Sequence, residues 1–219
     1  MFSDKVVPAI KKFASQPFVG FLVALYVVMT VADIVVSLFV DFNLLSLLIS
    51  LIVNGIMIYA VLVTYVSAVN EVTDSINTSG LEIMKKLMIL NVILSGITVA
   101  LNLFYVITSA WFLILALFGV LDVILYAKLV GTLDSIIYTI DCAYPDERVS
   151  DFVIIVMFVV GILNVVSVLI DFSAFGFVVS VLSCLLNCGC AYMLLQYRKL
   201  IGQLKTEIDA ENKQKEIAE

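Results

Sequence analysis

Six polar residues stand inside long apolar runs of this sequence, and two of them are carboxylic acids. They are Asp33, Asn54, Asn102, Asp122, Asn164 and Asn187. A charged side chain at the centre of a membrane helix costs about 2.5–3.5 kcal/mol, so such residues usually face a protein interior or a water-filled path. The acids can bind a proton or a small cation, whereas the asparagines can only donate and accept hydrogen bonds. The chemistry these residue types offer is therefore cation or proton transfer, or hydrogen bonding between helices.

The runs that carry these residues are long enough to cross a membrane. About 20 apolar residues in a helix span a hydrocarbon core of roughly 30 Å. The chain is 63% hydrophobic and 14% charged, whereas a soluble domain is about half apolar and a quarter charged. We therefore predict an all-α polytopic membrane protein with six transmembrane helices. Their predicted ranges are Phe18–Val40, Leu44–Ala68, Leu87–Ile107, Ala110–Ala127, Phe152–Ile170 and Ala174–Gln196.

Each predicted helix carries one of the six polar residues near the middle of the bilayer. Measured from the outer turns at 1.5 Å per residue, those on the odd-numbered helices lie about 10–12 Å deep and those on the even-numbered helices about 16–21 Å deep. We call this set the polar belt. Because no Lys or Arg lies at the same depth, the acids are expected to be neutral and to share hydrogen bonds with the asparagines unless a cation enters.

The connections between the predicted helices alternate between short and long. The short ones are Asp41–Asn43, Thr108–Ser109 and Asp171–Ser173, and they hold none of the 12 Lys and Arg residues. All 12 lie before the first helix, in or beside the two long connections, or after the last helix. The excess of positive charge on one side indicates the cytoplasm. We predict a plasma (inner) membrane protein with both termini in the cytoplasm: an N-terminal segment (1–17), a six-helix membrane domain (18–197) and a cytoplasmic helical tail (198–219).

The alternation of short and long connections predicts three tandem helical hairpins, at about 18–70, 85–138 and 151–197. The second helix of each hairpin has a polar residue shortly before a tyrosine: Asn54 and Tyr59, Asp122 and Tyr126, Asn187 and Tyr192. A recurrence of this kind is typical of a repeated supersecondary unit. The alternative is that apolar sequence of low complexity aligns with itself by chance.

Two stripes on the last helix predict contacts with other segments. Ser180, Cys184, Cys188 and Ala191 form a row of small residues, as is typical of close packing between membrane helices. Further along, Leu200, Leu204 and Ile208 follow one another at intervals of four on a charged helix. This second stripe is typical of a solvated helix that lies on the bilayer or on the chain's own loops; the alternative is docking of a cytoplasmic protein partner.

Composition removes several classes of function. The chain has no His, which removes the usual general base, and it contains no Ser–His or Cys–His pair, phosphate-binding loop or metal cluster. We therefore expect no enzyme, cofactor or metal. The net charge of −6 and the lack of a basic patch with aromatic neighbours argue against nucleic acid.

Three hypotheses remain for the polar belt. The leading one is a membrane-embedded interaction or scaffold subunit, in a homo-oligomer or a larger membrane complex, with partner contacts on the cytoplasmic face and a belt that holds helices together. The second is a small cation or proton channel or transporter that uses Asp33 and Asp122. The third is a pocket for a lipid or another small ligand.

Overall fold

The computed structural model describes residues 3–40, 44–107, 109, 111–168 and 174–218. Apart from short connections, these residues are helical. The helices are α1 (Ser3–Ala14), α2 (Pro17–Val40), α3 (Leu44–Val69), α4 (Ser79–Tyr105), α5 (Trp111–Asp141), α6 (Asp151–Val168) and α7 (Ala174–Ala218). The predicted all-α class is confirmed for this part of the chain.

Five of the helices contain apolar stretches long enough to cross a membrane. These stretches are Pro17–Val36, Leu47–Val69, Ser79–Tyr105, Trp111–Asp141 and Phe177–Gln214, and α6 contributes a shorter apolar stretch, Asp151–Val166. The structure therefore supports a helical, multi-pass membrane protein. The sixth span and the tandem repeat stay predictions.

The helix α4 illustrates why lipid is the natural surroundings of these helices. Gly80 is its one buried residue, although α4 is 27 residues long and strongly apolar. Ile93, Ile97 and Leu101 are each more than half exposed. Apolar surface of this extent is unfavourable in water and costs nothing in hydrocarbon.

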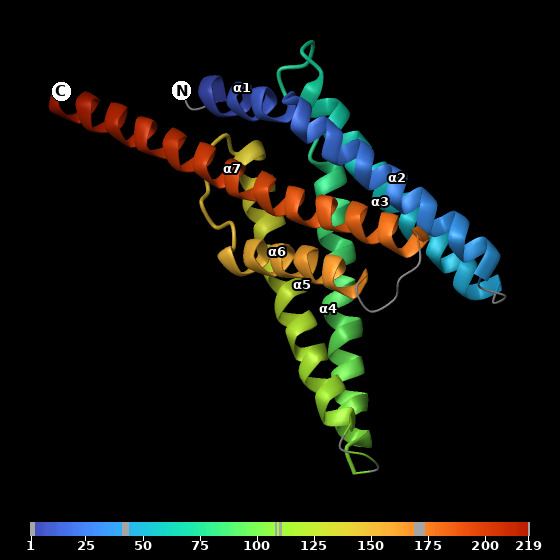
Figure 1. Cartoon of the computed structure of the whole chain (residues 1–219). Helices are drawn as coiled ribbons and strands as arrows, with labels where there is room; N and C mark the ends of the chain where they lie inside the picture. Colours follow the sequence, from blue (N-terminus) through green and yellow to red (C-terminus); the bar gives the residue numbers. More distant parts are fainter. Residues whose placement is uncertain (1–2, 41–43, 108, 110, 169–173, 219) are drawn as a thin grey trace.

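The helices pair in sequence order, and the pairs then diverge. Neighbouring helices pack as α2 with α3, α4 with α5, and α6 with α7. Figure 1 shows the α4/α5 pair projecting away from the end of the molecule where both termini lie, while α2/α3 and α6/α7 extend in other directions. Further contacts join α3 to α4, α2 to α7 and α5 to α6, but α2 and α5 are not neighbours.

The helices at the charged end are longer than the predicted spans. The prediction began the third helix at Leu87 and ended the fourth at Ala127, but α4 begins at Ser79 and α5 continues to Asp141. Hydropathy identifies the part of a helix that lies in hydrocarbon, whereas the polar residues beyond it are also good helix formers. The amphipathic helix α1, inside the segment predicted only as cytoplasmic, was not predicted.

The buried core lies at this charged end. One cluster joins Val6, Val7 and Ile10 of α1 to Ile140 of α5 and Ile208 of α7. A second cluster joins the start of α6 to α7, and its members are Val149, Val153, Ile154, Ala191, Leu194, Tyr197, Ile201 and Leu204. The segments at the charged end thus form a packed cap on the helices.

A glycine lies at each of five helix contacts. Gly20 lies against Tyr65, Gly80 against Ala60 and Thr64, Gly119 against Val99, Gly161 against Cys188, and Gly189 against Leu22. A Cβ atom at any of these positions would come within 3.0 Å of the neighbouring side chain or backbone. Small residues that let backbones approach closely are the usual contact between membrane helices.

Candidate functional site

The two acids of the polar belt lie on the surface of the single chain. Asp33 on α2 and Asp122 on α5 are both exposed. On α5 the neighbours of Asp122 include Phe118, which is 62% exposed, and Leu121, which is 51% exposed. A bundle interior shared by both acids was expected. In the structure Asp122 instead stands in an apolar face that nothing in the described chain covers.

Two asparagines of the belt bond within their own helices. Asn54 donates from Nδ2 to Ser50 Oγ at 3.2 Å, and Asn187 donates from Nδ2 to the carbonyl oxygen of Ser183 at 2.9 Å. Asn102 and Asn164 are half-buried. Since the pairs of helices diverge, the structure does not bring the six residues together in one ring within the chain.

The small-residue stripe of the last helix faces other helices along much of its length. Ala191 is fully buried, and Cys188 packs against Gly161 of α6. The Sγ atoms of Cys184 and Cys188 lie 3.9 Å apart on one face of α7. Ser180 is half-buried. In this structure the C-terminal part of the stripe, which includes Cys188, contributes to the contact of α7 with α6.

The candidate stripe for docking a cytoplasmic partner is used by the chain itself. Ile208 is 1% exposed and Leu204 is 7% exposed. Ile208 packs with α1, and Leu204 belongs to the cluster that joins α7 to the start of α6. Leu200 is half-buried and lines a cleft between α7 and α1. A partner could not reach Leu204 or Ile208 without displacing these contacts, because the amphipathic α1 already covers the tail.

A row of buried hydroxyls on α5 holds the connection between α5 and α6. Ser135 donates from Oγ to the backbone oxygen of Asp146 at 3.0 Å. Thr139 Oγ1 accepts the Asp146 backbone N–H at 3.1 Å, and Thr132 Oγ1 accepts that of Ser150 at 3.3 Å. All three hydroxyl residues are almost fully buried. They form hydrogen bonds with backbone groups of a connection that has no helix or strand to pair them.

Asp146 also binds Arg148 within the same connection. The Arg148 side chain donates from Nε to Asp146 Oδ2 at 2.7 Å, and its backbone N–H donates to Oδ1 at 3.1 Å. Burial of Asp146 acts to raise its pKa, but the hydrogen bonds and charge of Arg148 outweigh burial and lower the pKa of this carboxyl below its usual range. Asp146 is thus held as a carboxylate.

Most cations at the charged end bind groups of the chain itself. Ion pairs join Lys5 to Glu211, Lys85 to Asp134, Arg148 to Asp146, Arg198 to Asp151 and Lys205 to Glu147. Lys11 donates to the backbone oxygens of Asn70 and Thr73. These contacts tie α1, the connection after α3, the connection after α5 and the tail of α7 into one surface.

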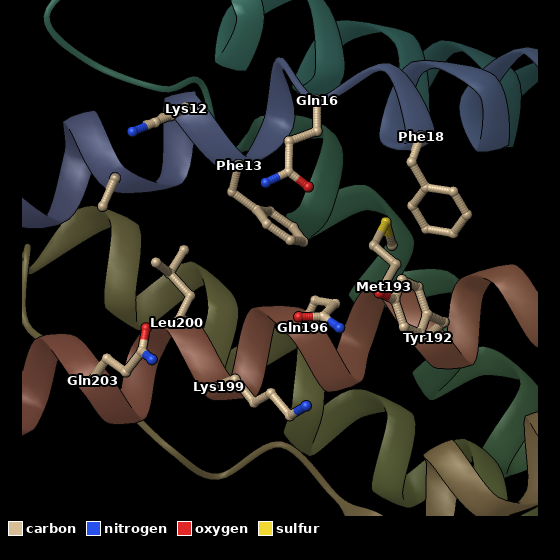
Figure 2. Close-up of a pocket in the computed structure, with 11 residues that line it drawn as sticks. Lys12, Phe13, Gln16, Phe18, Tyr192, Met193, Gln196, Lys199, Leu200 and Gln203 are labelled. Carbon is tan, nitrogen blue, oxygen red and sulfur yellow. The ribbon is translucent and has the colours of Figure 1, made fainter.

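Two lysines line a cleft between α1 and α7. The cleft has a volume of about 600 Å³, and both Lys12 and Lys199 line it and are exposed. Among the described residues neither side chain has a hydrogen bond or ion pair, which is also true of Lys86, Lys128 and Lys213 outside the cleft. Figure 2 shows Phe13 and Gln16 directed from α1 and its C-terminal turn toward α7, and Leu200 and Gln203 directed from α7 toward α1. The cleft was not predicted from the sequence, although its residues recur at helical intervals on both walls.

The described residues contain no group of three or more His, Cys, Asp or Glu side chains arranged to hold a metal ion. Comparison with family models, with curated proteins and with solved structures finds no match to this chain.

Proposed function

We propose that the protein is a membrane-embedded interaction or scaffold subunit of a protein complex. It associates with further membrane-spanning segments through the faces of α2 and α5 that carry Asp33 and Asp122. The observation that carries the proposal is the exposure of Asp122 in the middle of an apolar helix face. Asp122 lies about 16 Å along α5 from Trp111. At that depth an acid in contact with acyl chains is costly, and a second protein segment removes the cost.

The chemistry of the contact is hydrogen bonding in hydrocarbon. A neutral carboxyl donates one hydrogen bond and accepts others, so it can pair with a carbonyl, an asparagine or a second acid across an interface. Such bonds contribute about 0.6–2 kcal/mol each between membrane helices. The simplest partner is a second copy of this chain, because the diverging helix pairs leave the same faces open on every copy.

The proposed topology has six spans in three hairpins, with both termini in the cytoplasm of a plasma (inner) membrane. It is supported by the contacts among the basic segments. Lys5 of α1 pairs with Glu211 of α7, Lys85 of α4 with Asp134 of α5, and Lys205 of α7 with Glu147. Segments that bond to one another lie on one side of the bilayer, and their Lys and Arg content favours the cytoplasmic side.

Energy transfer between labelled copies tests the assembly. Cys142 is the exposed cysteine, so one preparation of the protein is labelled there with a donor fluorophore and a second with an acceptor. The two preparations are then reconstituted together in liposomes at high lipid content. We expect transfer for the wild type, loss of transfer for Asp122→Leu, and retention for Asp122→Asn, which keeps hydrogen-bonding groups. Asp209→Leu, the same change at an exposed tail position, is the matched control. Absence of transfer in the wild type, or equal transfer in Asp122→Leu, would contradict self-assembly.

The second candidate function is a cation or proton path, favoured by the fact that both exposed belt residues are acids. Copies that bring these carboxylates together could line such a path. The same liposomes are used to measure proton and monovalent cation flux. Flux that disappears in Asp33→Asn combined with Asp122→Asn would replace the assembly proposal by conduction, whereas negligible flux in assembled wild type supports assembly alone.

A further inference from the structure

The cleft between α1 and α7 changes character along its length. At one end Phe18 of α2 and Tyr192 of α7 meet edge to face, with ring centroids 5.3 Å apart. From there Gln196, Lys199 and Gln203 follow on α7 at helical intervals. The cleft therefore runs from an aromatic and apolar end to an end where amides and lysines lie beside Ala9, Phe13 and Leu200.

This change coincides with the beginning of the apolar stretch of α2 and with the first charged residues of α7. The candidate span of α2 begins at Pro17, directly beside the cleft residues Gln16 and Phe18. On α7, the first charged residue after the apolar run is Arg198. The rise from Tyr192 to Gln203 is about 16 Å, whereas the headgroup layer on each side of the hydrocarbon is only about 5–7 Å thick. The cleft thus covers a headgroup layer and the beginning of the acyl region.

Two lysines without a side-chain partner among the described residues lie at the cleft, whereas Lys86, Lys128 and Lys213, which also lack one, lie elsewhere. The net charge is −6, and acids at the same end pair with Lys5, Lys85, Arg148, Arg198 and Lys205. Yet Lys12 and Lys199, on opposite walls, have no such partner among the described residues. In Figure 2 the Lys12 side chain runs along α1 and the Lys199 side chain ends on the side of α7 away from α1, and their flexible stems allow both to turn toward the cleft.

We propose that this cleft binds an anionic phospholipid of the cytoplasmic leaflet. Lys12 and Lys199 bind the charged headgroup, and the amides of Gln16, Gln196 and Gln203 donate hydrogen bonds to its oxygens. Phe18 and Tyr192 contact the first methylenes of the acyl chains, as aromatic rings do at the membrane interface. A soluble phosphate would bind only at the end of the cleft that carries the lysines and amides, and it would leave the aromatic end uncovered. The proposal does not depend on assembly through Asp122.

The expected strength follows from the two lysines. A Lys near an anionic membrane surface strengthens binding about fivefold, so removing both should weaken binding about 20-fold to 30-fold. The lysines are exposed and make no contact that folding requires, so Lys12→Gln combined with Lys199→Gln should fold normally. Lys86→Gln combined with Lys213→Gln is the matched control, since both lysines are exposed outside the cleft.

The test measures lipid binding to the full chain in a neutral detergent by native mass spectrometry and by the midpoint of thermal unfolding. Phosphatidylglycerol and phosphatidylcholine with identical acyl chains are titrated separately, and inorganic phosphate is titrated alone. We expect selective retention of phosphatidylglycerol and a raised midpoint, both lost in the double Gln variant, kept in the control, and restored in Lys12→Arg with Lys199→Arg. Equal retention of both lipids, or unchanged binding in the double Gln variant, would overturn the proposal. Equal stabilisation by inorganic phosphate would also overturn it, in favour of a soluble anion.

Discussion

Gly80 on α4 lies directly against the backbone oxygen of Ala60 on α3, with Thr64 of α3 beside it. A methyl group at position 80 would overlap that oxygen, which belongs to a helix backbone and cannot move aside cheaply. Gly80 is also the one buried residue of α4. The contact between α3 and α4 therefore depends on the absence of a side chain at this position.

Gly80→Ala should lower the stability of the folded chain by separating α3 from α4. Overpacking of this kind typically costs about 1–3 kcal/mol. Gly96→Ala on the same helix is the control, because a Cβ there meets nothing within 4 Å. Thermal unfolding in detergent should show a lower midpoint for Gly80→Ala and an equal or higher midpoint for Gly96→Ala. Equal midpoints for the two variants would mean that the close approach is not a feature of the protein.

Thr139→Val should loosen the connection between α5 and α6. The valine keeps the shape of the side chain but leaves the Asp146 backbone N–H without its acceptor, which costs about 1–3 kcal/mol for a buried group. The readout is tryptic cleavage after Arg148, which should become faster than in the wild type. Thr206→Val serves as the control, since Thr206 is exposed and its hydroxyl bonds only to Gly202 of its own helix. A cleavage rate unchanged in Thr139→Val would show that the hydroxyl row does not hold this connection.

The Asp146–Arg148 pair should make stability depend on pH in the acid range. Because the pKa of Asp146 is lowered in the folded chain, the unfolded chain binds a proton more readily. The stabilisation is complete above the ordinary carboxyl pKa of about 3.9 and is lost as pH falls through the lower folded pKa. The wild type should therefore exceed Asp146→Asn in unfolding midpoint at pH 6, and the difference should shrink toward pH 3. Arg148→Gln should reduce the same dependence; an unchanged profile in Arg148→Gln would refute this cause.

Ile208→Ala should release α1 from the tail of α7. Ile208 is 1% exposed and packs with Val6, Val7 and Ile10, and truncation of a buried Ile to Ala costs about 2–5 kcal/mol. Hydrogen exchange of α1 amides should accelerate in this variant and stay unchanged in Glu207→Ala, whose side chain is exposed. If Ile208 were instead free for a partner, both variants would exchange like the wild type.

The sequence was sufficient to locate the long apolar helices and insufficient to show how they pack. The predicted helix Leu44–Ala68 agrees with α3 to within one residue, because hydrocarbon thickness fixes the length of an apolar run. The amphipathic pattern of Val6, Val7 and Ile10 was present in the sequence but lies outside the apolar runs, so α1 was not predicted.

The orientation of individual side chains could not be predicted in the same way. In lipid the free energy of an apolar side chain is similar in contact with protein and in contact with acyl chains. Hydropathy therefore does not indicate which face of α5 packs against other helices. The exposure of Asp122 and the contacts of Gly80 and Gly161 depend on that choice. The cleft between α1 and α7 depends in addition on how the segments at the charged end fold, which no apolar run reveals.

Cross-linking at Phe118 tests the proposed assembly most directly. Phe118 lies one turn before Asp122 on the same exposed face of α5, so Phe118→Cys keeps the acid in place. In a background where the four native cysteines are replaced by alanine, oxidation of native membranes should yield a disulfide-linked dimer, and Asp122→Leu should abolish it. A chain that remains monomeric on oxidation, with Cys at position 118 fully labelled by a lipid-soluble maleimide, would contradict the account.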